Sequence, residues 1–292
     1  MGAPLPKSWL SPPVTQSALT LAPSDLERDQ QWMQPHTLRD AAHIFNQHGV
    51  VKIKHALPPS LLEPIAKLVD KNFEHYMALL RNRKIDPQAQ PFAFREICHR
   101  APRRYDVQLG EIARYPLPED LGDALSHALW QPLLKRLLGG TMNHNFDGVV
   151  VAEPGAAAQE PHMDGGHLFH ATHGFSLDLP VHMVNVFIPL IDVPLEVGPT
   201  EFWPQSHRAQ YVDSVEEIES VALTAQRGDA IIFDYRIFHR GCPNLSTERR
   251  PVLYQTYSRS WCKDGHNFPK VSIEDVMTTG DLTTFNPSTG FH

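Results

Sequence analysis

Two potential metal ligands, His162 and Asp164, lie two positions apart in the sequence. In an extended chain, residues i and i+2 point to the same side, so this imidazole and this carboxylate can converge on one ion, with Met163 facing the other way. A catalytic metal needs a further ligand, and His239 is the best candidate. Two histidines and one carboxylate on one face of an ion leave the opposite face open, as in non-haem Fe(II) enzymes that activate oxygen.

A His-x-Asp pair is weak evidence by itself, because the chain has 17 histidines and 33 acidic residues. Taken alone, the pair is better explained as a turn before the glycine pair 165–166. The surroundings of His239 favour the metal site. The Gly228-Asp229 turn precedes an apolar strand, a second short strand carries His239, and Arg250 opens a further strand of β-branched and aromatic residues through position 257.

In order and spacing, several segments resemble the phytanoyl-CoA dioxygenase-like (PhyH-like) family of Fe(II)/2-oxoglutarate-dependent oxygenases. They span about residues 145 to 261 and comprise His162-x-Asp164, Gly198 to His207, Gly228-Asp229, His239-Arg-Gly, and Arg250 with its strand. The resemblance implies a mainly β fold with flanking helices around a double-stranded β-helix, the jelly roll or cupin-like core.

The resemblance also implies a role for each matching residue. His162, Asp164 and His239 would be the catalytic residues that bind Fe(II), and Arg250 would clamp the far carboxylate of the co-substrate 2-oxoglutarate, with O2 as the second co-substrate. Thr200 would also contact 2-oxoglutarate, although a hydroxyl at the start of a strand is an equal alternative. Because Asp164 is retained, we expect hydroxylation, desaturation or a related oxidation, whereas related halogenases lack this carboxylate.

Composition narrows the possible partners. The 292 residues carry a net charge of −7 without a long basic run, which argues against nucleic acid, and no apolar run approaches the roughly 20 residues of a membrane span. The three scattered cysteines are not a disulfide framework, so we expect a reducing, cytoplasmic location. A small-molecule substrate is therefore expected, and the oligomeric state stays open.

The chain reads as a single domain, residues 1–292. We expect an irregular leader over 1–25, a helical buttress over 37–140, the catalytic β core over 145–261 and a C-terminal tail over 262–292. Within the buttress, the pattern predicts a helix from Thr37 that ends at Gly49, a strand to position 54, a helix from about 58 to 80 and a helix over 119–138.

Other groups are candidates for substrate contact. His167, His170 and His173 form either a second, zinc-like site or part of a mobile loop over the active site. The basic pair Arg103-Arg104 either binds an acidic group or covers a strand in solvent, and Asn185 either reaches into the barrel or is a satisfied core amide. An apolar pocket is expected from four aromatic residues, Phe92, Phe94, Tyr257 and Trp261.

These observations predict an Fe(II)- and 2-oxoglutarate-dependent dioxygenase that oxidises a small or medium-sized metabolite, with secondary metabolism as the candidate context. One alternative is an acyl-CoA hydroxylase of the same family, but the sequence lacks a basic cluster suited to the phosphates of CoA. Others are a non-catalytic metal-binding jelly-roll protein and an iron oxygenase that uses no 2-oxo acid, which would leave Arg250 without a role.

Overall fold

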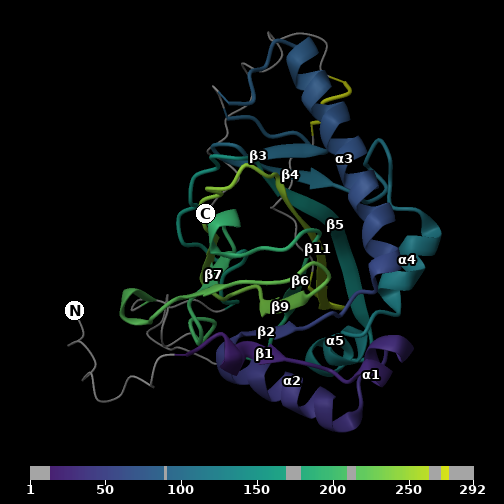
Figure 1. Cartoon of the computed structure of the whole chain (residues 1–292), viewed down its shortest axis with the longest axis vertical. Helices are drawn as coiled ribbons and strands as arrows, with labels where there is room; N and C mark the ends of the chain where they lie inside the picture. The colour runs from purple at the N-terminus through teal and green to yellow at the C-terminus, as the bar shows by residue number, and fades with distance from the viewer. Residues whose placement is uncertain (1–13, 89–90, 169–178, 209–214, 263–270, 276–292) are drawn as a thin grey trace.

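Two β-sheets form the centre of the molecule (Figure 1). The structure, a computed structural model, describes residues 14–88, 91–168, 179–208, 215–262 and 271–275. In spatial order, the large sheet contains β1 (Thr20–Leu21), β2 (Val50–Ile53), β9 (Ala230–Asp234), β6 (Met183–Pro189), β11 (Arg250–Arg259), β5 (Met142–Ala152), β4 (Arg104–Gln108) and β3 (Ile97–Ala101). The small sheet contains β10 (His239–Gly241), β7 (Thr200–Phe202) and β8 (Val221–Leu223). The mainly β fold with a double-stranded β-helix core is confirmed.

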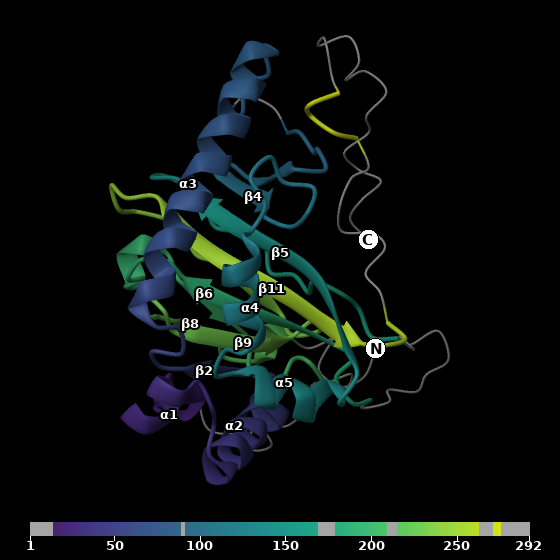
Figure 2. The same cartoon turned by 90° about the vertical axis from the view of Figure 1, so that its right-hand side faces the viewer.

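Helices cover the outer face of the large sheet, and Figure 2 shows α3 and α4 crossing in front of it. The helices are α1 (Asp25–Gln30), α2 (Pro35–His48), α3 (Pro59–Asn82), α4 (Glu119–Ser126) and α5 (Gln131–Leu138), and two 3-10 turns are η2 (Ser17–Leu19) and η3 (Leu195–Val197). Gly49 ends α2 with a φ of 80°, as expected for a glycine after a helix. No described helix is both long and apolar enough to span a bilayer.

The large sheet separates an apolar core from an internal cavity, because successive side chains of a strand point to opposite faces. Leu253 of β11 and Val149 of β5 pack in the core against the helices. Their neighbours Val252 and Val150 line the cavity on the other face. One wall of the cavity is thus the inner face of a sheet whose outer face packs on the main core.

The structure corrects several expected boundaries. The helix expected over 119–138 is two helices, because Pro132 cannot donate the backbone hydrogen bond that a continuous helix needs and its ring would clash with the carbonyl one turn earlier. The stretch 37–140 supplies β3 and β4 as well as β2, the strand expected up to position 54. Within the leader, the described residues from 14 onwards include η2, β1 and the first residue of α1.

The expectation of a pocket lined by four aromatic residues is wrong, because three of them are buried in the apolar core instead. Phe92, Phe94 and Tyr257 are each at most 5% exposed and belong to the core beneath the helices, where large aromatic surface is removed from water. Trp261 is 62% exposed. None of the four lines the cavity.

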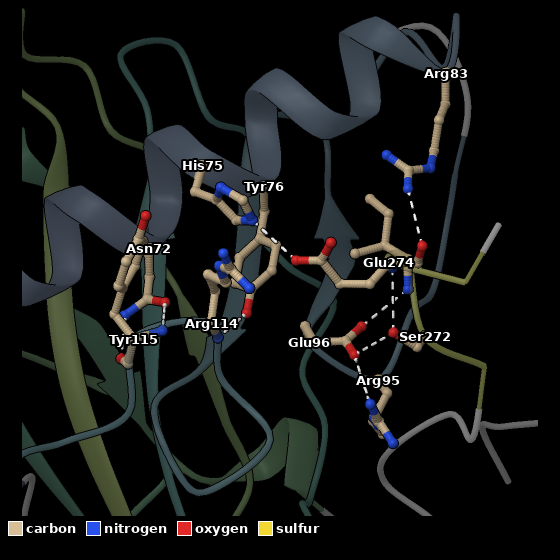
Figure 3. Close-up of polar contacts among 11 residues, drawn as sticks. Asn72, His75, Tyr76, Arg83, Arg95, Glu96, Arg114, Tyr115, Ser272 and Glu274 are labelled. Atoms are coloured by element: carbon tan, nitrogen blue, oxygen red, sulfur yellow. Dashed lines mark hydrogen bonds and ion pairs between the residues drawn. The ribbon is translucent and has the colours of Figure 1, made fainter. Parts of the chain in front are cut away.

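A short segment of the predicted tail, residues 271–275, packs beside α3 and beside Arg95 and Glu96, which precede β3 (Figure 3). The buried carboxylate of Glu96 accepts hydrogen bonds from the Ser272 hydroxyl at 2.6 Å and the Ile273 amide at 3.0 Å. The Ile273 side chain is fully buried in the main core. This segment is therefore an integral part of the fold.

Candidate active site

The structure brings His162, Asp164 and His239 together. One nitrogen or oxygen atom from each lies within 4.8 Å of the other two, an arrangement able to hold a metal ion. His239 Nε2 is 3.6 Å from one Asp164 oxygen, and His162 Nε2 is 3.9 Å from the other. His239 belongs to β10. His162 lies outside the named strands, and two backbone hydrogen bonds of 2.9 and 3.0 Å pair it with His239.

Hydrogen bonds fix which ring nitrogen each histidine can offer. His162 Nδ1 is 2.8 Å from the Glu160 carbonyl, and His239 Nδ1 is 3.0 Å from the Ile237 carbonyl. A carbonyl only accepts, so Nδ1 carries the hydrogen and Nε2 keeps the lone pair that a metal requires. Burial lowers the pKa of His239 to about 4, so its ring is neutral at pH 7 and ready to act as a ligand.

A cavity of about 1000 Å³ opens from the three potential ligands. Met163 also lines the cavity, so the expectation that its side chain faces away from the potential ligands is wrong. The reason is that the backbone bends at Asp164 and does not continue as an extended strand. Leu168 also lines the cavity, whereas His170 and His173 lie outside the described residues. The mobile-loop and zinc-site interpretations of this segment therefore stay predictions.

Arg250 and Thr200 both line this cavity and are both buried. Thr200 begins β7 and pairs with Gly241 of β10. The Nη1 atom of Arg250 donates to the Gly198 carbonyl, and its Nε has no hydrogen-bond partner within the described part of the chain. Burial lowers the pKa of Arg250 to about 9, since a guanidinium without a neighbouring anion is poorly solvated there. The site is thus prepared for an anion.

Arg104 is the residue whose surroundings differ most from the sequence expectation. It is fully buried, its Nη2 donates to the Cys242 carbonyl at 2.8 Å, and its Nε and Nη1 have no partner among the described residues. Burial lowers its pKa to about 10. The alternation of polar and apolar residues in β4 shows that Arg104 shares a face with Asp106. The alternation does not show whether this face borders solvent or the interior. Because Arg104 is buried, the solvent-exposed interpretation of this residue is wrong.

Gly241 explains why the His239-x-Gly pattern suits this site. A Cβ atom there would overlap Arg104 Nη1 and lie 2.8 Å from the Gln159 side-chain oxygen. That oxygen accepts a hydrogen bond from the Gly241 amide at 3.1 Å. The missing side chain therefore leaves space for Arg104 and Gln159 beside the strand that carries His239.

A second polar cluster lines the cavity on β4 and β11. Tyr254 donates to Asp106 at 2.8 Å and accepts from Gln108 at 2.9 Å. Arg100 forms an ion pair of 2.7 Å with the other Asp106 oxygen. Burial, followed by the charge of Asp106, raises the pKa of Tyr254, so its hydroxyl stays protonated. Tyr254 reaches Asp106 across β5 because Gly148 has no side chain in its way.

Asn185 is also closer to the site than the sequence indicated. Its side-chain amide donates to Asp164 at 2.6 Å, and its carbonyl oxygen accepts from Thr256 at 2.5 Å. Asn185 is therefore hydrogen-bonded as a core amide would be, but one of its partners is a potential metal ligand. Periodicity placed it on a strand without revealing this partner, which is distant in sequence.

A jelly roll with two histidines, one carboxylate and a buried arginine lining one cavity defines the class of non-haem metal-dependent oxygenases. Comparisons with known proteins agree. Two curated fungal relatives are dioxygenase olcK of Penicillium canescens, 28% identical, and dioxygenase trt7 of Aspergillus terreus (strain NIH 2624 / FGSC A1156), 25% identical. Each alignment covers 74% of this chain, and 68% and 71% of the respective relative.

Solved structures share the fold. The α-ketoglutarate-dependent carbocyclase SnoK from nogalamycin biosynthesis matches with a TM-score of 0.56 at 18% identity over 97% of each chain. The epimerase SnoN in complex with Fe³⁺, α-ketoglutarate and nogalamycin RO matches with a TM-score of 0.53 at 16% identity, over 89% of this chain and 93% of that one.

The model of the phytanoyl-CoA dioxygenase (PhyH) family matches residues 45–252. The chain belongs to this family. It is a non-haem Fe(II)- and 2-oxoglutarate-dependent dioxygenase, and the expected family, enzyme class and cofactors are confirmed.

Proposed function

We propose that this enzyme oxidises a small or medium-sized, largely apolar metabolite, using His162, Asp164 and His239 to hold Fe(II) and Arg250 and Thr200 to hold 2-oxoglutarate. One observation carries the proposal: the three potential ligands and a buried, incompletely hydrogen-bonded arginine line the same cavity. A metal-binding protein without catalysis would have no need of that second feature.

The residues present fit both groups. Neutral imidazoles and a carboxylate suit Fe(II), and the Nε2 atoms are the ones left without a carbonyl partner. For 2-oxoglutarate, Arg250 supplies a planar donor set that matches a carboxylate. Arg104 supplies a second buried cation, which we add to the proposed pocket. An anion bound here would compensate two charges that are costly to bury alone.

When bound, Fe(II) would allow O2 to oxidise 2-oxoglutarate to succinate and carbon dioxide, with one oxygen atom entering succinate and the other remaining to oxidise the substrate. The protein contributes position and the exclusion of water. Arg250, held by the Gly198 carbonyl, would fix the far carboxylate in the cavity, and Thr200 would add a hydroxyl beside it. The rest of the cavity is left for the substrate.

The cavity wall supports a metabolite as substrate. Its volume of about 1000 Å³ is at the upper end for small-molecule sites, and apolar groups such as Phe146, Met183 and Phe187 line much of it. Its two lining arginines are Arg250, assigned above to 2-oxoglutarate, and Arg100, which is paired with Asp106. An acyl-CoA hydroxylase needs several cations for the CoA phosphates, so we place this alternative second.

The test is turnover of 2-oxoglutarate together with the near-visible absorption band that Fe(II) and 2-oxoglutarate give without oxygen. The wild-type protein should show both, Asp164→Ala should lose both, and Arg250→Ala should lose the band at 2-oxoglutarate concentrations that saturate the wild type. Arg249→Ala is the matched control, because Arg249 pairs with Asp70 and Glu74 outside the cavity. Metal binding without any band would favour a non-catalytic metal protein.

A screen of metabolite extracts with iron and 2-oxoglutarate would then define the substrate. Products heavier by one oxygen indicate hydroxylation, and products lighter by two hydrogens indicate desaturation.

We also propose a cytoplasmic location, supported by the three free cysteines Cys98, Cys242 and Cys262. Fractionation of cells that express the protein tests this.

A further inference from the structure

We infer that Asn185 and Thr256 are positioning residues that orient Asp164 for metal binding and join this ligand to the large sheet. The inference rests on the proposed role of Asp164 as a ligand. Asn185 lies on β6 and Thr256 on β11, and the two residues are direct cross-strand partners. Both side chains line the cavity and both residues are at most 5% exposed.

The direction of the two hydrogen bonds is determined by their chemistry. An ionised carboxylate only accepts, so the NH2 group of Asn185 must face Asp164, at 2.6 Å. The amide oxygen of Asn185 then faces Thr256, whose hydroxyl must donate, at 2.5 Å. If the amide were turned over, its oxygen would face the carboxylate oxygen. Asp164 therefore selects the orientation of the Asn185 amide, and Thr256 holds Asn185 in this orientation by donating to the amide oxygen.

This support matters because Asp164 does not belong to either sheet. It lies in a bend, where a carboxylate without support would sample several rotamers. His239 belongs to the small sheet, and His162 is attached to it by two backbone hydrogen bonds. The hydrogen bond from Asn185 connects Asp164 to the large sheet instead. The metal ligands are thus anchored to both sheets of the jelly roll.

The hydrogen bond also limits how Asp164 can bind. One of its oxygens, Oδ2, is engaged by Asn185, which favours coordination through a single oxygen. A carboxylate that used both oxygens would occupy an additional site on the ion. Holding Asp164 in this way preserves the open positions that 2-oxoglutarate and O2 require in the proposed function.

The experiment measures Co(II) affinity of the metal-free full-length protein by calorimetry, which does not depend on turnover. Loss of a partner that orients a metal ligand typically costs about 10- to 100-fold in affinity. We expect a loss of this size for Asn185→Leu and a smaller loss for Thr256→Val. Thr256→Ser keeps the hydroxyl and should restore wild-type affinity, a rescue that a purely structural role of the methyl group would not give.

Ser258→Ala is the matched control. Ser258 follows on the same strand, is fully buried and donates to the Cys262 carbonyl at 2.6 Å, away from Asp164. It should lower the free energy of unfolding about as much as Thr256→Val, with unchanged Co(II) affinity.

The outcomes separate the two proposals. If the wild-type protein binds no Co(II), the proposed metal site fails. If it binds and Asp164→Ala does not, but Asn185→Leu binds as tightly as the wild type, only the positioning role is overturned. Should Asn185→Leu not fold, the Thr256→Val and Thr256→Ser pair decides: equal affinities in both variants would refute the inference.

Discussion

Arg104 and Arg250 lie on the same face of the large sheet, each paired in register with Ala152 of the strand between them. Two strand spacings separate their backbones by about 10 Å. No described carboxylate lies within ion-pair distance of either guanidinium. Two buried cations on one face of a sheet are unfavourable unless an anion joins them, which supports the proposal that the co-substrate carboxylates bind near this pair.

Removing one of these cations should have opposite effects on binding and on stability. Arg104→Met should weaken 2-oxoglutarate binding about 10- to 100-fold, the equivalent of a hydrogen bond to a charged group. The free energy of unfolding without co-substrate should stay the same or rise, because a buried charge is removed. Titration of 2-oxoglutarate and urea unfolding measure the two effects. Unchanged 2-oxoglutarate affinity would exclude Arg104 from the pocket.

Gly241→Ala tests the same pocket from the adjacent strand. The new methyl group would overlap the end of the Arg104 side chain, which must then move, so we expect at least about a tenfold loss in 2-oxoglutarate affinity. Gly140→Ala is the control, since a Cβ atom there meets no atom within 4 Å. Equal affinity in the two variants would show that Arg104 can move without consequence.

His207 should make the protein less stable in acid. It is 7% exposed, and burial lowers its pKa to about 4. In the unfolded chain its pKa is near 6.5, so the unfolded state binds more protons between these values. Stability is therefore retained above pH 6.5 and lost as the pH falls towards 4, by at most about 3 kcal/mol for this group.

Urea unfolding from pH 7 to 4 in the presence of a chelator measures this loss. His207→Gln should show a shallower dependence than the wild type, and replacement of the exposed His36 is the control. Identical slopes in the His207→Gln variant and the wild type would contradict the assignment.

Glu96 should hold the segment 271–275 in place (Figure 3). Glu96→Gln keeps the shape but replaces one acceptor oxygen by a donor, so it should lower the free energy of unfolding by about 1–3 kcal/mol. Amide exchange at Ile273 should become faster. Glu274→Gln affects only a partly exposed contact with His75 and should cost less than about 1 kcal/mol. Similar losses in both variants would argue against a special role for Glu96.

Local patterns predicted much of this architecture because they reflect local physics. Gly49 ends α2 because a glycine adopts the left-handed backbone conformation required after the helix. The turn at Gly228 leads into β9, as expected. The grouping of His162, Asp164 and His239 was accessible because two of them are close in sequence and the third is next to a recognisable turn.

The errors concern information that one-dimensional patterns lack. Alternation shows which residues share a face, but not whether that face borders solvent or a cavity, and so Arg104 was misjudged. Aromatic residues serve a core and a binding pocket equally well, and so Phe92 and Phe94 were misplaced. The link from Asn185 to Asp164 depends on how two distant segments pack, which no local pattern contains.

The crossing of Tyr254 over Gly148 also governs which molecules the enzyme can accommodate. With any side chain at position 148, the phenol ring would have to swing away from Asp106 and into the space where substrate is proposed to bind. A smaller residue at position 254 would instead deepen that space. Neither position belongs to the three potential metal ligands, so changes there are expected to broaden or narrow the range of accepted molecules without altering the reaction chemistry.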